Sequence, residues 1–225
     1  MKTVINQHMF RHRETTSAAL NNLGTIIHKL AEEGVYTGQI VQGKQLLGTF
    51  RLTYDRKHEA SQVNIDLSAF DALSRANVPG LLARNESVVG QDGYVVFYTS
   101  GQHSALHVTL TKAQDTNGRP SFDSRKLARG DLIALRLFYP GSYTLTNELG
   151  DQQATLTVLS EENGKYRDPS KLEPVRVKLS DKGFDPAKIE QWPLQALVIS
   201  VDTAAALVVK SVGPELDKRA RRGRD

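Results

Sequence analysis

The chain contains no cysteine, and this absence excludes several kinds of chemistry at once. Without thiols there are no disulfide bonds, no thiolate nucleophiles and no thiolate metal sites. No apolar run approaches the roughly 18 residues that a membrane span requires. Residues 1–8 also lack the apolar core of a secretory signal. We therefore expect a cytoplasmic protein, unless an upstream targeting segment is missing.

The net positive charge is confined to one short segment. The net charge is +4, and the tail from Lys218 to Asp225 carries five cations, so the rest of the chain is close to neutral. We expect residues 214–225 to form a basic, disordered tail. A nucleic-acid coat or packaging role would use its arginines, and it stays open as an alternative although the rest of the chain shows no basic face with interleaved aromatics. These arginines are Arg219, Arg221, Arg222 and Arg224.

The first part of the chain, residues 1–85, reads as a helix followed by strands. Apolar residues recur at three- and four-residue spacing, and this period predicts a helix over 16–33 that ends at Gly34. Its expected buried stripe consists of Leu23, Ile26, Ile27 and Leu30. The period then changes to two, which predicts strands at 35–41, 46–54 and 62–67 in an antiparallel β-meander, followed by a short helix at 69–75.

The second part, residues 86–213, is nearly all strand and turn. Alternating segments at short, regular spacing favour an antiparallel β-sandwich over a parallel sheet. No internal repeat is strong. The fold class is therefore mainly β, with an N-terminal helix and meander before the sandwich. The expected strands are 94–98, 103–111, 132–139, 142–147, 154–159, 175–179, 196–201 and 206–209.

One stretch of this second part resembles a known family. The strand 132–139, a Pro140-Gly141 turn and the strand 142–147 are similar to the closing hairpin of a cupredoxin. The resemblance covers roughly residues 86–160 and implies a cupredoxin-like β-sandwich. In that family the strand after such a turn delivers a copper-binding cysteine, which joins two histidines and usually a methionine.

The copper ligands of that family are missing here. Asn147 holds the place of the cysteine, no histidine lies beyond His107, and the only methionines are Met1 and Met9. The resemblance thus implies the fold without its copper, and we expect no cofactor. His103 and His107 are weak candidates for another metal, but two residues four apart on one strand lie roughly 13 Å apart. One ion cannot bridge them without a bulge.

A polar cluster at residues 122–131 is the other candidate site. Asp123 or Asp131 could act as a general base there, whereas the simpler interpretation has Asp123 or Ser124 capping a turn and Arg125 solvated or paired. Nothing in the sequence supplies a nucleophile with a base and a group to orient it.

The sequence favours a non-enzymatic structural or interaction protein. A sandwich without its metal site and with many strand edges is expected to form a homo-oligomer or to dock on a protein partner, although fold alone does not fix function. The alternative is an enzyme whose site lies at the junction of the two parts and uses His103, His107, Asp123 or Arg125.

Overall fold

The computed structural model describes residues 14–70, 86–101, 105–115, 117–160 and 168–212. The described residues are mainly β: strands and bridges account for 55% of them and helices for 3%. Within the described ranges, helical structure is confined to residues 69–70 and to the 3₁₀ turn η4, Pro169–Lys171. The rest of the helix expected at 69–75 lies outside the described residues.

Seventeen strands follow one another along the described chain. They are β1 Glu14–Thr16, β2 Gly24–His28, β3 Gly34–Gln42, β4 Gln45–Tyr54, β5 Gln62–Asp66, β6 Glu86–Val89, β7 Tyr94–Tyr98, β8 Leu106–Lys112, β9 Phe122–Asp123, β10 Leu132–Leu135, β11 Gly141–Asn147, β12 Gln153–Val158, β13 Val175–Ser180, β14 Gly183–Asp185, β15 Lys188–Gln191, β16 Leu197–Val201 and β17 Leu207–Val212.

The predicted helix at 16–33 is wrong. Residues 14–16 and 24–28 form strands β1 and β2, and turns and bridges connect them. Thr25, Ile26 and Ile27 are β-branched residues, which favour a strand, and pairing with two neighbouring strands outweighs the helical period of the apolar residues. Three residues of the expected stripe are buried, but Ile27 points to the opposite face of β2 and is half-buried.

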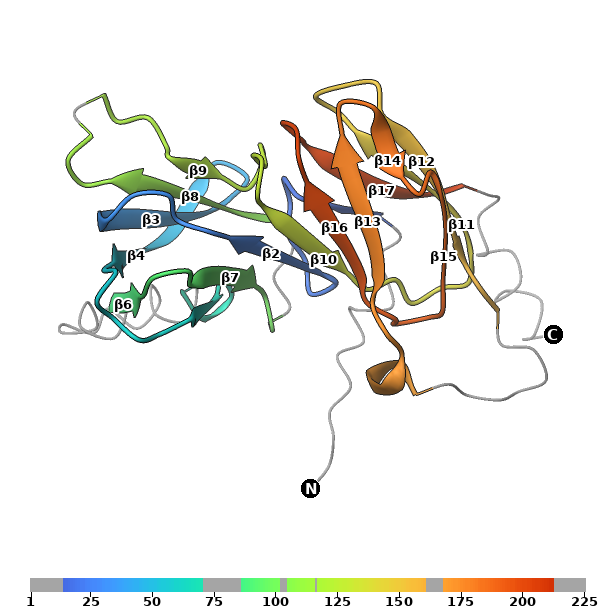
Figure 1. Ribbon diagram of the computed structural model, residues 1–225, viewed down its shortest axis with the longest axis horizontal. Coiled ribbons are helices and arrows are strands. Elements are labelled where there is room, and N and C mark those ends of the chain that lie inside the picture. The colour runs from blue at the N-terminus through green and yellow to red at the C-terminus, as the bar shows by residue number, and fades with distance from the viewer. Residues whose placement is uncertain (1–13, 71–85, 102–104, 116, 161–167, 213–225) are drawn as a thin grey trace.

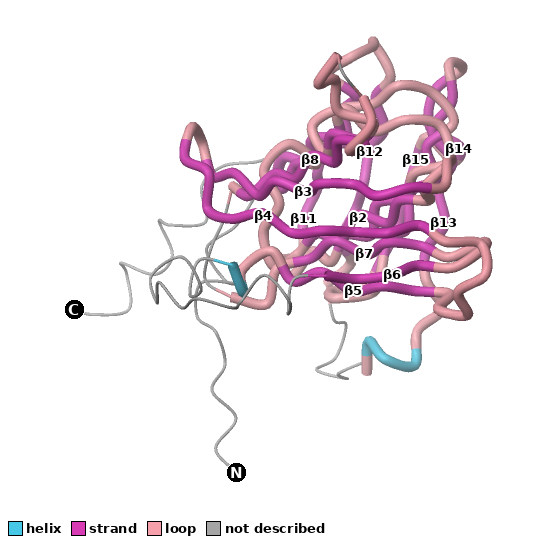
Figure 2. The backbone as a smooth tube through the Cα atoms, turned by 90° about the vertical axis from the view of Figure 1, so that its left-hand side faces the viewer, coloured by secondary structure: helices cyan, strands magenta, loops and turns pink. Residues whose placement is uncertain are grey.

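The strands form three sheets. A seven-stranded middle sheet has the order β14-β13-β16-β10-β2-β7-β5, and two five-stranded sheets pack on one of its faces. One of these has the order β6-β4-β3-β8-β9 and the other β1-β17-β11-β12-β15. Figure 1 shows β2 and β10 at the centre of the molecule, and Figure 2 shows β3 and β4 lying over β7, β5 and β6. A single buried apolar cluster runs through both halves.

This strand order corrects three further expectations. β10 and β11 lie in different sheets, so the segment around Pro140-Gly141 crosses between sheets and closes no hairpin. β5 pairs in parallel with β7 and not with β4, so residues 34–66 form no meander. Strands β6 to β8 share their sheets with β2 to β5, and the structural division therefore does not fall at residue 85.

The chain is an internal duplication. The first repeat runs from β2 to β8, and the second runs from β10 to β17 without β14. The two repeats have the same strand order. Their parallel strand pairs also correspond: β5·β7 is equivalent to β13·β16, and β4·β6 to β12·β15. Equivalent residues near the start of each repeat lie 107 positions apart, as Ser17 and Ser124 do. Between positions 17 and 37 the other identical pairs at this spacing are Leu20/Leu127, Ile26/Ile133, Leu30/Leu137, Gly34/Gly141, Tyr36/Tyr143 and Thr37/Thr144.

Local details repeat with the topology. Gly34 and Gly141 begin equivalent strands with φ of 142° and 145°, a region that side chains with a Cβ atom rarely adopt. Two residues later, the Tyr36 hydroxyl donates to the carbonyl of Glu32 and the Tyr143 hydroxyl donates to that of Tyr139. Each hydroxyl therefore fastens the chain that enters its strand to the strand itself.

The two repeats exchange their leading segments. β1 precedes the first repeat but pairs with β17 of the second, whereas β9 precedes the second repeat and pairs with β8 of the first. Ser17 and Ser124 are fully buried and make equivalent contacts. The backbone N–H of Leu207 donates to Ser17 Oγ and that of Val108 to Ser124 Oγ, each at 3.1 Å. Each repeat is thus completed by a segment that leads into the other.

An approximate two-fold axis relates the repeats. β2 and β10 pair antiparallel at the centre of the middle sheet, with Ile26 opposite Ile133. These two residues occupy equivalent positions, so the axis passes between them. The pairs Leu132 with Ile27 and Ala134 with Thr25 exchange under the same rotation. The two repeats therefore share one backbone arrangement, and the side chains at equivalent positions can be compared directly.

Candidate functional site

The clearest departure from this symmetry is a buried ion pair. His28 Nδ1 lies 2.6 Å from Asp131 Oδ1, and the two side chains are 12% and 3% exposed. The backbone N–H of Ala128 donates to the other carboxylate oxygen at 2.8 Å. An ionised carboxylate only accepts hydrogen bonds, so Nδ1 carries a proton. The other ring nitrogen, Nε2, has no hydrogen-bond partner among the described residues.

His28 is held in place and also opens to solvent. Its ring lies 4.2 Å from that of Phe122, centroid to centroid, so the leading segment of the second repeat covers one face of the imidazole. On another side His28 lines a cleft of about 530 Å³. We call this the His28 cleft, and its other polar residues are Lys29, Glu32, Tyr36, Lys112, Gln114, Asp115 and Ser121.

Most polar groups of the His28 cleft already have partners. Lys112 Nζ lies 2.7 Å from Glu32 Oε2, and its hydrogen bond and charge lower the pKa of Glu32. Burial raises the pKa of Tyr36, whose hydroxyl donates to the Glu32 carbonyl. The Ser121 hydroxyl donates to the carbonyl of Leu110 at 3.0 Å and is therefore not free to act as a nucleophile. His28 is the side chain that is oriented by a carboxylate and still offers a free ring nitrogen.

The other repeat shows that the fold does not require this ion pair. Leu135 occupies the position equivalent to His28, and Gly24 the position equivalent to Asp131. They lie opposite each other in the pairing of β2 with β10, and a Cβ atom on Gly24 would sit 3.6 Å from the Leu135 side chain. An apolar contact thus fills, at this end of the β2–β10 pair, the place that the ion pair fills at the other end.

The structure brings three of the four predicted site residues together. His107 on β8 and Asp123 on β9 lie near Arg125, which follows β9 and holds Asp123 through two-pronged hydrogen bonds of 2.7–3.1 Å. Burial and the nearby Arg125 cation lower the pKa of His107, against the opposing effect of Asp123. Burial acts to raise the Asp123 pKa, but the Arg125 hydrogen bonds bring it below its usual value. His103 lies outside the described residues.

Sequence reasoning named Asp131 but missed His28. The two residues are 103 positions apart, and the sequence places His28 inside an apolar segment with no motif around it. The available signal was the repeat: aligning the chain on itself at a spacing of 107 sets His28 against Leu135 and Asp131 against Gly24.

Asn147, at the place of the family's copper-binding cysteine, makes structural contacts. Its amide nitrogen donates to Gln152 Oε1 at 2.9 Å and to the Ala204 carbonyl at 3.1 Å. Its amide oxygen accepts from the backbone N–H groups of Ala206 and Leu149. Asn147 is 1% exposed, and these hydrogen bonds of its side chain connect two loops of the second repeat.

Gln191 is a second buried polar departure from the symmetry. It is 1% exposed, and neither its amide oxygen nor its amide nitrogen has a hydrogen-bond partner among the described residues. The parallel pairs β4·β6 and β12·β15 make Val89 its equivalent in the first repeat. An unsatisfied buried amide opposes folding, and valine shows that an apolar side chain suits this position.

We therefore expect Gln191→Leu to raise the free energy of unfolding by about 1–3 kcal/mol, the usual cost of an unsatisfied buried polar group. Urea denaturation followed by circular dichroism measures the change. Gln195→Leu is the matched control and should destabilise, because the Gln195 amide accepts from Trp192 N and donates to the Glu173 carbonyl. A destabilised Gln191→Leu protein would show that the amide has a partner in solution.

The described residues contain no group of three or more His, Asp or Glu side chains that could hold a metal ion. They also include no helix with the length and hydrophobicity to cross a membrane. The tail arginines Arg219, Arg221, Arg222 and Arg224 lie outside the described residues, so the structure does not bear on a nucleic-acid role for them.

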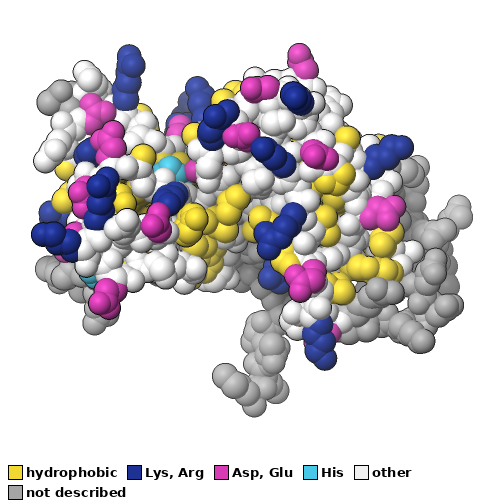
Figure 3. All heavy atoms as spheres, viewed as in Figure 1, with side chains coloured by type: hydrophobic (Ala, Val, Ile, Leu, Met, Phe, Trp, Pro, Cys, Tyr) yellow, Lys and Arg dark blue, Asp and Glu magenta, His cyan; other side chains and the backbone are white. Residues whose placement is uncertain are grey.

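The outer face of the middle sheet is the second candidate site. Ile26, Phe97, Ile133 and Ile199 point from this sheet into the core, and their neighbours along each strand point the other way. The outward side chains at the centre are half-buried and apolar, and Figure 3 shows hydrophobic side chains at the surface in the middle of the molecule. We call this set the apolar strip: Ile27, Val96, Leu132, Ala134 and Val198.

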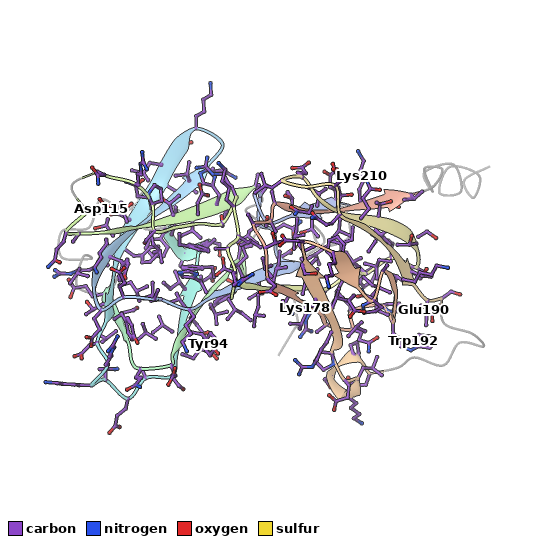
Figure 4. All side chains as sticks on the ribbon, turned by 45° about the horizontal axis from the view of Figure 1, so that its top comes forward. Tyr94, Asp115, Lys178, Glu190, Trp192 and Lys210 are labelled. Carbon is purple, nitrogen blue, oxygen red and sulfur yellow. The ribbon has the colours of Figure 1, made fainter. Side chains whose placement is uncertain are left out.

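Polar and charged residues border the apolar strip on both sides. On β13, Arg176 and Lys178 are exposed beside Val198 and Ser200. On β5, Asn64 and Asp66 stand beside Val96 and Tyr98. Tyr94, which is 40% exposed, continues the strip along β7. Figure 4 shows Tyr94 in the first repeat and Lys178 in the second. An apolar centre with a polar rim is the usual anatomy of a protein interface.

Comparison of the chain with models of known protein families, with curated proteins and with solved structures finds no match.

Proposed function

We propose that the protein is a non-enzymatic interaction module that self-associates through the outer face of its middle sheet. The observation that carries this proposal is the apolar strip, which lies at the centre of the largest sheet and is not covered by any described element. A contiguous apolar surface of this kind is uncommon on monomeric proteins and usually marks an interaction site.

Light scattering after size-exclusion chromatography, over a range of concentrations, tests this proposal. We expect the wild-type protein to be an oligomer and Leu132→Lys to be a monomer, because a charge at the centre of the apolar strip must be desolvated on association. Leu46→Lys is the matched control: Leu46 is 53% exposed on the β3–β4 hairpin, away from the strip, so its oligomer should persist. A wild-type protein that stays monomeric at every concentration would refute the proposal.

The His28 cleft supports a second candidate function, catalysis at the junction of the repeats. Its specific observation is the buried carboxylate that orients a histidine with a free ring nitrogen, which is the arrangement of a general base. Hydrolysis of model esters by the wild-type protein, lost in a folded His28→Gln variant, would favour this function. Hydrolysis that survives in that variant would exclude His28 as the base.

A further inference from the structure

We infer that the partner on the outer sheet face is a second copy of this chain, packed face to face about a two-fold axis parallel to β2 and β10. This inference rests on the proposed self-association and adds the orientation of the two copies. It follows from the placement of apolar and charged residues across the middle sheet.

The apolar strip is self-complementary in this orientation. Ile27 and Leu132 lie opposite each other in the β2–β10 pair, one on each side of the sheet centre. A rotation about an axis parallel to the strands sets Ile27 of each copy over Leu132 of the other. The same rotation sets Val198 over Tyr98, because both lie one strand further from the centre and one residue from the Ile26–Ile133 pair. Two sheets packed in this way have nearly aligned strands, the common geometry of stacked sheets.

The charged rim selects this axis over the alternative. Arg176 on β13 and Asp66 on β5 stand at the same level along the strands and equally far from the centre, on opposite sides. The strand-parallel axis therefore sets Arg176 of one copy over Asp66 of the other. An axis perpendicular to the strands sets Arg176 over Lys178 instead, which juxtaposes like charges.

Both groups of this predicted contact are available as charges. Arg176 is exposed and makes no ion pair with any described residue. Burial acts to raise the Asp66 pKa, but hydrogen bonds from Ser100 and Ser68 bring it below its usual value. Asp66 is therefore ionised at neutral pH and presents a fixed negative charge. Two such contacts per dimer give the interface its orientation, since opposite charges steer and align docking surfaces.

Cysteine cross-linking tests the orientation directly, because the chain has no cysteine of its own. Lys178 and Asn64 are both exposed, and the strand-parallel axis sets one over the other between copies. Facing sheets lie about 10 Å apart, a gap that a bismaleimide with a spacer of about 10 Å bridges, whereas within one chain the two residues lie five strands apart, roughly 24 Å. We expect this reagent to join Lys178→Cys and Asn64→Cys proteins into a covalent dimer when they are mixed, and to join neither variant alone.

A mixture of Arg176→Cys and Lys178→Cys proteins tests the perpendicular axis. A covalent dimer in that mixture, with none in the first, would overturn the proposed orientation. Light scattering of the same samples shows whether the proteins associate, independently of their orientation. Dimers that fail to cross-link in the first mixture contradict the orientation and leave self-association intact, whereas monomers in every sample contradict both.

Discussion

Replacing His28 with leucine should lower the free energy of unfolding by about 3–5 kcal/mol, the cost of leaving a buried charge without its partner. The Asp131 side chain is 3% exposed, and after the substitution only the Ala128 N–H would hydrogen bond to it. Urea denaturation, followed by circular dichroism and by the fluorescence of Trp192, measures the loss. A loss under roughly 1 kcal/mol would mean that water reaches the carboxylate and compensates it.

The double variant His28→Leu, Asp131→Gly tests whether the fold needs the ion pair. It gives one end of the β2–β10 pair the same side chains that the symmetry-related end already carries at Leu135 and Gly24. We expect it to recover most of the lost stability, because replacing a buried ion pair by apolar packing is often neutral. Recovery would mean that the fold does not need the ion pair. A double variant as unstable as the single one would show that the pair is structural.

The strands were the most predictable part of the fold. The alternation of apolar residues placed β3, β4, β7, β11 and β13 close to their observed limits, because each strand has one face in the core. The pattern of β2 was ambiguous. Its buried residues also recur at three- and four-residue spacing, and only its pairing with β7 and β10 decides for a strand.

Which strands pair was much less predictable than where they lie. The Pro140-Gly141 turn has the local sequence of a hairpin turn. In the structure, however, β10 pairs with β2 and β16, and β11 pairs with β12 and β17. These partners are distant in sequence, and a turn signature carries no information about them. The duplication was equally hidden, since seven identical residues between positions 17 and 37 and their equivalents are spread too thinly to be noticed without the aligned structures.

The candidate sites were unpredictable for the same reason. His28 and Asp131 meet because β2 and β10 pair across the two repeats, and the apolar strip combines side chains from β2, β7, β10 and β16. Local sequence did identify His107, Asp123 and Arg125 as a polar cluster. There Nε and one terminal nitrogen of Arg125 hydrogen bond to Asp123, and burial together with the Arg125 cation lowers the pKa of His107.

The exchange of leading segments predicts a matched pair of large effects. Leu20 and Leu127 are equivalent residues, 0% and 1% exposed, in the segments that follow the exchanged strands β1 and β9. Leu20 forms a backbone bridge to Leu106 of the first repeat, and Leu127 forms one to Ala205 of the second. Leu20→Ala and Leu127→Ala should each lower the free energy of unfolding by about 2–5 kcal/mol, since both leave a cavity in the core. Leu46→Ala and Leu149→Ala, at positions 53% and 48% exposed, are the controls and should change it by under about 0.5 kcal/mol.

These variants also show whether the repeats unfold together. Trp192 lies in the second repeat, so its fluorescence reports on that repeat, whereas circular dichroism reports on all strands. β1 belongs to the sheet of the second repeat, and the middle sheet runs through both repeats. We therefore expect Leu20→Ala to shift both signals to the same lower urea concentration, in one cooperative transition. If Leu20→Ala shifted the dichroism alone and left the Trp192 transition in place, the first repeat would unfold independently, and the exchanged segments would not couple the two halves.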